Sequence, residues 1–233
     1  MNERMTPYLN SDKLSDTQLW LLAPSAMLTV LNAQRHDMLF PLRDEDTPED
    51  RADTKRCLDQ DWDVTDAKTL AETVEFLHQA PPLWQAMQGW HPYSSDEYQV
   101  LHQGDWPDSL KNLLTMVEQY GCSMPAGDLA WHLGRCAWVV RSACQVGYID
   151  EDDAWKLLTE NGNRIARAFN SWAEFGMSYA IGAQYFRSQR FNAESIQRYR
   201  SHLTTLLTHP DSPWVRLPWE AYTPEDVEEA VSG

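Results

Sequence analysis

The chain has 233 residues, 42% hydrophobic and 23% charged, which are the proportions of a globular domain with a sizeable core. Its 35 acidic and 19 basic residues give a formal net charge of -16, which repels nucleic acids and anionic membrane surfaces. No stretch approaches the roughly 18 uninterrupted apolar residues of a membrane span, and the N-terminus lacks the apolar region of a signal peptide. We therefore expect a cytoplasmic protein that binds neither nucleic acid nor membrane.

The residue types that carry chemistry show no recognisable site spacing. The cysteines contain no CxxC pair, and a chain of this length needs no disulfide, so we expect reduced thiols. The histidines lack the spacing of a zinc site, and the acidic run after Asp150 lacks the glycine and the final acid of a calcium-binding EF-hand loop. One basic stretch is expected to pair with neighbouring carboxylates rather than to bind a polyanion: Arg187, Arg190, Arg198 and Arg200. The sequence thus predicts no metal and no cofactor.

The first predicted helix begins with a capping box. Ser15 starts the pattern Ser-Asp-Thr-Gln immediately before an apolar run. Pro24 should kink or divide the helix, which extends to about residue 34.

Two further helix starts follow. Thr47 is expected to cap a helix that has Pro48 in its first turn and ends near Asp61. Thr65 is expected to cap the next helix, which Pro81 ends. This helix carries an apolar stripe at spacings of three and four residues: Ala67, Leu70, Val74 and Leu77.

The middle of the chain has the least regular pattern. Turn residues between positions 83 and 104 predict a surface loop around a short helix, and any hinge belongs here. Residues 105–120 then predict a helix that Gly121 closes.

The apolar pattern of the second half predicts four successive helices, over residues 128–145, 150–169, 171–187 and 192–208. Their short connections favour antiparallel neighbours. Thr223 begins a short acidic helix at the end, and strand signals are scarce throughout. The predicted fold is all-α, a single multi-helix domain with an antiparallel helical core in its second half. Within it, residues 1–60 are N-terminal helices, residues 61–187 the core, and residues 188–233 C-terminal helices with an acidic tail.

The helix predicted over residues 128–145 is apolar on two opposite sides. One stripe is small and suits close helix contact: Ala130, Leu133, Ala137, Val140 and Cys144. The opposite stripe contains Trp131, Arg135, Trp138, Ser142 and Gln145. Aromatic stripes at helical spacing are usually core, so both tryptophans are expected to pack against a second layer of helices. Arg135 leaves a second interpretation open, because a guanidinium between two indoles can bind a carboxylate or phosphate, or form an internal ion pair.

The next predicted helix places another aromatic face beside the first. Its members are Trp172, Phe175, Gly176, Tyr179, Ala183 and Phe186. The glycine and alanine allow a neighbouring helix or a ligand to approach closely. Glu174 lies off this face and is interpreted as a surface acid rather than a catalytic base.

Short motifs in this region resemble a known family. They are Trp62-Asp63-Val64 with Thr69-Leu70, Ala130 through Arg135, Gly147-Tyr148-Ile149, Ala154-Trp155, Ser171-Trp172 and Tyr179 through Gly182. This series is similar to that of the YbeU/YbeR-like bacterial proteins, the family of domain of unknown function 1266, over residues 61–187. The resemblance implies a helical fold and a bacterial, cytoplasmic setting, and it carries no activity, cofactor or partner.

One position departs from the family pattern. The central family motif usually reads Ala-Trp-Asp followed by Arg, whereas His132 occupies the acidic position here. If that acid has a function in the family, this chain has lost or altered it. The residues Trp131, Arg135, Trp172 and Tyr179 are singled out both by the helical pattern and by the resemblance.

Two hypotheses about function follow. The first is a non-enzymatic binding or interaction protein, with an aromatic pocket anchored by Arg135 for a protein or a small anionic ligand. The alternative is a hydrolase-like enzyme that acts on an anionic small molecule, with His132 or a nearby carboxylate as general base. No dinucleotide-binding, P-loop or nucleophile-elbow motif is present, although a triad assembled across helices stays open. The candidate binding residues are Trp131, His132, Arg135, Trp138, Trp172 and Tyr179.

Overall fold

The computed structural model describes residues 5–42, 46–79, 94–107, 111, 114–115, 118, 126–186 and 193–224. These residues form helices joined by turns, and no strand occurs among them. The predicted all-α fold class is therefore confirmed. In the described part of the chain, no helix has the length and apolar character needed to cross a membrane.

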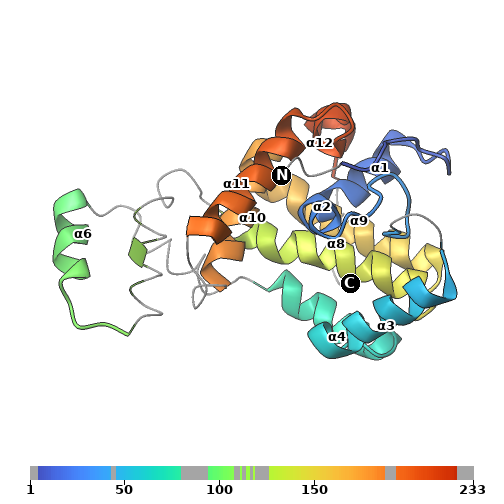
Figure 1. Cartoon of the computed structure of the whole chain (residues 1–233), viewed down its shortest axis with the longest axis horizontal. Coiled ribbons are helices and arrows are strands. Elements are labelled where there is room, and N and C mark those ends of the chain that lie inside the picture. Colours follow the sequence, from blue (N-terminus) through green and yellow to red (C-terminus); the bar gives the residue numbers. More distant parts are fainter. Residues whose placement is uncertain are drawn as a thin grey trace, which may run out of the picture.

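Helix α8 (Leu129–Gln145) lies among most of the other helices, several of which pack directly against it (Figure 1). After its first residue, every residue of α8 is buried except Arg135. Both predicted stripes are therefore covered, so a second layer of helices does pack over the tryptophans. This burial makes Arg135 the exception on an otherwise enclosed helix.

Helices α9 (Glu151–Ala168) and α10 (Trp172–Phe186) pack against α8. The backbone at Gly182 approaches Trp131, and that at Gly134 approaches Tyr179. Later positions of α8 thus meet earlier positions of α10, as in the predicted antiparallel core. Helix α11 (Ala193–Thr208) packs on α10, followed by α12 (Pro213–Arg216) and the short turn η4 (Trp219–Ala221).

The N-terminal helices follow their local signals. Ser15 caps α1 (Asp16–Leu22) in a capping box with Gln18, as predicted. Pro24 lies in the 3₁₀ turn η1 (Ala23–Ser25), which separates α1 from α2 (Ala26–Leu31). The predicted division at this proline is confirmed.

Helix α3 (Pro48–Trp62) begins at the predicted cap, Thr47, whose hydroxyl accepts from the N–H of Asp50 at 3.1 Å. Helix α4 (Ala67–His78) begins one residue later than predicted. Its cap is Asp66, which accepts from the N–H of Thr69 at 2.8 Å, so the prediction of Thr65 is wrong. In the predicted stripe Leu70, Val74 and Leu77 are buried, whereas Ala67 is exposed.

Several predicted features lie outside the described residues. These are Pro81, the turn residues before position 94, most of the helix at 105–120, Arg187 and Arg190, and the helix after Thr223. A described helix, α6 (Ser95–His102), lies between these turn residues and residue 105, and it starts at the capping box of Ser94.

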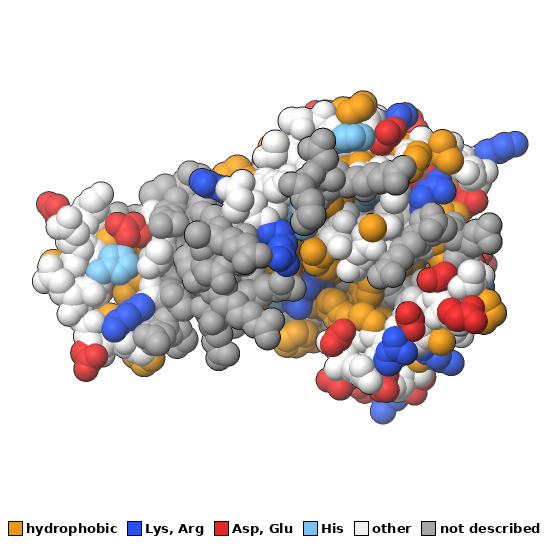
Figure 2. All heavy atoms as spheres, in the orientation of Figure 1, with side chains coloured by type: hydrophobic (Ala, Val, Ile, Leu, Met, Phe, Trp, Pro, Cys, Tyr) orange, Lys and Arg blue, Asp and Glu red, His pale blue; other side chains and the backbone are white. Residues whose placement is uncertain are grey.

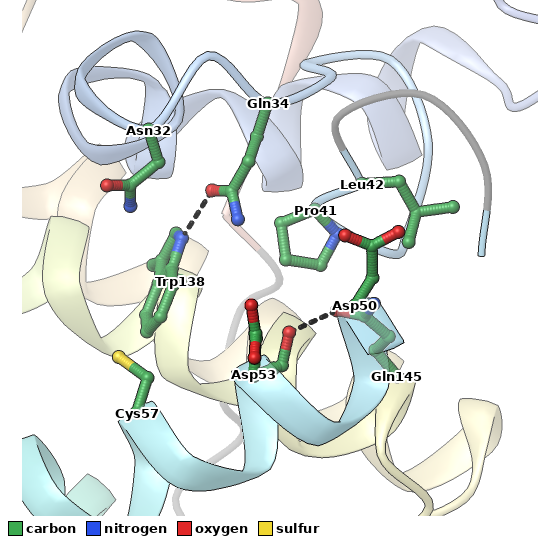
Figure 3. A pocket seen from close by; sticks show the side chains of 10 residues that line it. Asn32, Gln34, Pro41, Leu42, Asp50, Asp53, Cys57, Trp138 and Gln145 are labelled. Carbon is green, nitrogen blue, oxygen red and sulfur yellow. Dashed lines mark hydrogen bonds between the residues drawn. The ribbon is translucent and has the colours of Figure 1, made fainter. Parts of the chain in front are cut away.

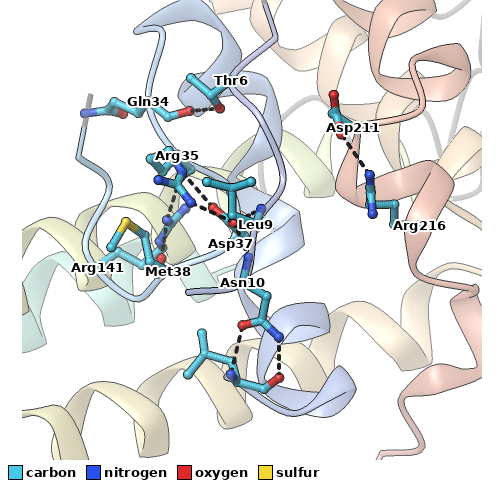
Figure 4. A network of polar contacts seen from close by, with 11 residues as sticks. Thr6, Leu9, Asn10, Gln34, Arg35, Asp37, Met38, Arg141, Asp211 and Arg216 are labelled. Atoms are coloured by element: carbon cyan, nitrogen blue, oxygen red, sulfur yellow. Dashed lines mark hydrogen bonds and ion pairs between the residues drawn. The ribbon is translucent and has the colours of Figure 1, made fainter. Parts of the chain in front are cut away.

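A buried arginine fixes the segment between α2 and α3. The fully buried Arg141 of α8 donates to the carbonyl oxygens of Arg35 and Met38 (Figure 4). It also donates to the carbonyl oxygen of Leu39 and to the hydroxyl of Ser25. Burial lowers the pKa of Arg141 to about 9, which still leaves the guanidinium charged at neutral pH. A segment without regular structure is thereby held to the central helix.

The same segment is tied to the N-terminus through Asp37. Its buried carboxylate accepts from the backbone N–H groups of Leu9 and Asn10 and pairs with Arg35 at 2.9 Å (Figure 4). Burial opposes ionisation of Asp37, but these hydrogen bonds lower its pKa overall.

His36 makes the stability of this segment sensitive to acid. Burial, followed by the charge of Arg141, lowers the pKa of His36 to about 3, so the folded protein keeps the ring neutral. In the unfolded chain His36 has the usual histidine pKa of about 6.5 and takes up a proton below that pH. The free energy of unfolding that is present above pH 6.5 therefore falls as the pH drops, with a slope that approaches about 1.4 kcal/mol per pH unit.

The His36→Gln variant is therefore expected to lose less stability between pH 6.5 and pH 5.5 than the wild type, by about 1 kcal/mol. Urea unfolding at several pH values measures this difference. His78 has a pKa that burial also lowers, and it is present in both proteins, so its contribution cancels. Equal pH slopes in the two proteins would contradict a neutral, buried His36.

Candidate functional site

The candidate site is built around a stack of flat side chains along α8. The Arg135 guanidinium lies 4.5 Å from the ring centroid of Trp131 and 5.4 Å from that of Trp62. Trp62 in turn stacks on Trp138 with centroids 6.0 Å apart, and Trp131 stacks on Phe186 at 6.3 Å. We call these five residues the aromatic–arginine ladder. It joins α8, the end of α3 and the end of α10.

Trp62 enters the ladder because of how α3 ends. Asp63 adopts a left-handed conformation with φ of 55°, and the N–H of Val64 donates back to the carbonyl of Leu58 at 2.9 Å. Trp62 is not among the site residues predicted from the sequence. Its only signal was the Trp62-Asp63-Val64 motif, one of those on which the resemblance to a known family rests.

Arg135 opens into a pocket of about 380 Å3 between the end of α3, helix α4 and α8. Its Nε donates to the carbonyl of Trp131 at 3.2 Å. Among the described residues, no carboxylate lies within ion-pair distance of Arg135, and the other N–H groups of its guanidinium have no hydrogen-bond partner. Burial lowers the pKa of Arg135, while Tyr179 and Asp128 act in the opposite direction. The internal ion pair considered as one interpretation is not formed within this part of the chain.

Carboxylates line the same pocket. Asp61, Asp63 and Glu72 lie around it together with Thr69, Thr73 and the exposed Phe76. Figure 2 shows apolar side chains in the hollow between α4 and the helices above it, with charged side chains of both signs over α3 and α4. A group bound at Arg135 would therefore meet one cation and an acidic rim.

A second polar group lies at the start of α8. His132 Nε2 is 3.7 Å from a carboxylate oxygen of Asp128, and both side chains are buried. Neither side chain has a hydrogen-bond partner among the described residues, nor does the indole N–H of Trp131. Asp128, one turn earlier on the chain, thus places a carboxylate beside the ring of His132.

The structure brings most predicted site residues together. Tyr179 packs edge-on against Trp131 at 5.1 Å, so Trp131, His132, Arg135 and Tyr179 form one group. Trp138 joins this group through Trp62.

Trp172 lies in a different aromatic cluster. Its ring packs against Trp20 at 5.1 Å, Trp214 at 5.8 Å and Trp219 at 4.8 Å, and its indole N–H donates to Leu217. All these contacts are within the hydrophobic core. They place Trp172 with the N- and C-terminal segments rather than with Arg135.

The metal-binding side chains and the cysteines of the described residues are arranged as follows. No group of three metal-binding side chains occurs in the described ranges. Burial raises the pKa of Cys57 and of Cys144 to about 11 and that of Cys136 to about 12, so these thiols stay protonated at neutral pH. Glu174 accepts from the N–H of Asn170 at 2.9 Å and so stabilises the start of α10, consistent with a surface role.

Comparison with known families matches residues 57–219 to a protein of unknown function, DUF1266. The match covers more than half of the chain, including the ladder and the Arg135 pocket. The chain belongs to the DUF1266 family. Comparison with curated proteins and with solved structures gives no match. The DUF1266 assignment supplies no substrate or reaction, so function has to be argued from the site.

Proposed function

We propose that this DUF1266 protein is a non-enzymatic binding protein whose Arg135 pocket captures an acidic group of a small molecule or a partner protein. The observation that supports this is Arg135 itself, partly exposed in a pocket and without a carboxylate partner in the described ranges. Trp62 and Trp131 hold the guanidinium plane, and a planar fork suits bidentate binding of a carboxylate or phosphate.

The acidic rim narrows the ligand class. Asp61, Asp63 and Glu72 disfavour a ligand that carries several negative charges. A ligand with one acidic group and a basic or hydrogen-bond-donating remainder would pair with Arg135 and with the rim at once. We therefore favour amphoteric ligands, such as amino acids, short peptides or an exposed protein segment that carries both charges.

The test is a thermal-shift screen of amino acids, short peptides and phosphorylated metabolites against the full chain. At a concentration of about 100 times Kd, a ligand stabilises the folded state by about 2.7 kcal/mol, which raises Tm by several degrees. The Arg135→Met variant is expected to lose the Tm shift while remaining folded. Arg164→Met is the matched control, because Arg164 is an exposed arginine on α9 that pairs with Glu160.

The outcomes separate a site from a structural role. A folded Arg135→Met protein that still binds every ligand found in the screen would contradict the proposal. An unfolded Arg135→Met protein, with Arg135→Lys folded and binding as the wild type does, would assign the residue to packing instead.

A second candidate function is a hydrolase-like enzyme acting on an anionic small molecule. It is favoured by the buried pair of His132 and Asp128, in which a carboxylate next to the ring can orient it as a general base. Incubation of each bound compound with the protein, followed by mass spectrometry, tests this candidate. Product formation that is lost in a stable His132→Gln variant would replace the binding proposal with the enzymatic one.

The biological setting belongs to the same proposal. We place the protein in the bacterial cytoplasm, nearest within the family to the YbeU/YbeR-like members. Its acidic composition and the absence of a spanning helix among the described residues are compatible with that setting.

A further inference from the structure

A second, smaller pocket lies on the other side of the Trp62–Trp138 pair from the Arg135 pocket. Its volume is about 140 Å3, and it is enclosed by residues 32–42, the start of α3 and the second half of α8 (Figure 3). It shares no lining residue with the Arg135 pocket. The two pockets are therefore separate, and a ligand of one does not require a ligand of the other.

Two amides offer hydrogen-bond donors to this pocket. Gln34 Oε1 accepts from the indole N–H of Trp138 at 2.9 Å, and Gln145 Oε1 accepts from the hydroxyl of Thr54 at 3.4 Å. In the parts of the chain that the structure describes, neither amide nitrogen has a hydrogen-bond partner. Gln145 is only 2% exposed. Both residues line the pocket, so these amide nitrogens can donate to an acceptor on a bound molecule.

The opposite wall offers acceptors. Asp50 and Asp53 project from the first turns of α3, as Figure 3 shows. Asp50 accepts from Thr47 and Asp53 from Arg56, and each carboxylate retains capacity for further hydrogen bonds. No lysine, arginine or histidine is among the described residues that line the pocket. Asp50 and Asp53 disfavour an anion, and a simple cation would leave both amides without acceptors.

We infer that this pocket binds a small uncharged polyhydroxylated molecule, a polyol or a single sugar. Each hydroxyl group both donates and accepts, so one such molecule can meet the amides and the carboxylates together. Trp138, Pro41 and Leu42 supply an apolar wall for its C–H groups. The small volume excludes longer oligosaccharides.

Saturation-transfer NMR on the full chain tests the inference with glycerol, sorbitol, glucose and mannose as probes. At least one of them is expected to bind saturably. Gln145→Met keeps the length of the side chain and removes its amide, and it is expected to weaken binding at least tenfold. Gln60→Met is the matched control, because Gln60 is an exposed glutamine on α3 outside both pockets.

Further measurements separate loss of the pocket from loss of the fold, and polyol binding from binding at Arg135. Circular dichroism checks the fold of each variant, and Asp50→Asn replaces Gln145→Met if the latter unfolds, with the same tenfold weakening expected. Arg135→Met is expected to leave polyol binding unchanged, so this inference and the proposed function fail separately. No saturable binding of any probe, undiminished binding in the folded pocket variants, or tighter binding of a small diamine than of every polyol would overturn the inference.

Discussion

Replacing Arg141 with methionine is expected to lower the free energy of unfolding by about 3–5 kcal/mol. Methionine fills much of the same space but donates no hydrogen bonds, so the carbonyls of Arg35, Met38 and Leu39 would lose their buried donor. Unpartnered buried carbonyls cost more than the lost hydrogen bonds would suggest. The segment between α2 and α3 should separate from α8 first.

Urea unfolding followed by circular dichroism measures this loss. Arg164→Met is again the control, and its exposed ion pair predicts a change of about 0.5 kcal/mol or less. Arg141→Lys should fall between the two, because an ammonium keeps the charge but cannot reach all of the same acceptors. A loss below about 1 kcal/mol for Arg141→Met would mean that the segment is held by other contacts.

Local sequence signals were enough to predict most of the fold. The caps at Ser15 and Thr47 depend on neighbouring residues only, and both are formed. The error at Thr65 has the same local origin. Thr65 and Asp66 both offer a side-chain oxygen, and the choice depends on which of them can accept from the N–H of Thr69.

The pattern on α8 also predicted part of the candidate site. Trp131, Arg135 and Trp138 repeat at helical spacing, so they share one side of the helix whatever packs against it. Sequence could not show that Trp62 lies between Arg135 and Trp138, since that position depends on how α3 meets α8. Nor could it reveal Arg141, whose partners lie about 100 residues earlier in a segment without periodic pattern.

The separation of Trp172 from the ladder has a simple geometric reason. Trp172 and Tyr179 share a face of α10, but seven residues of helix span about 10 Å along the axis. That distance lets one end of a single face contact Trp131 while the other contacts Trp20. A shared face therefore predicts common orientation, not a common site.

Substituting Gly182 with alanine is expected to destabilise the protein by about 2 kcal/mol, although alanine favours helix over glycine by about 1 kcal/mol. A Cβ atom at this position would lie 2.3 Å from the Cβ of Trp131 and 3.0 Å from that of Asp128. These atoms are close to the backbone and cannot rotate away, so α10 and α8 would have to move apart. Urea unfolding measures the change.

Gly162→Ala on α9 is the matched control. The nearest atom to a Cβ there is the end of the flexible Leu21 side chain, which can rotate, so we expect a change within about 1 kcal/mol. Because Gly182 faces Trp131 at one end of the ladder, Gly182→Ala should also weaken binding at Arg135 and leave the polyol pocket beside Trp138 unaffected. Equal stabilities of the two variants would show that the contact between α8 and α10 at Gly182 is not tight, and that the position of Trp131 is set by Tyr179 and Phe186 instead.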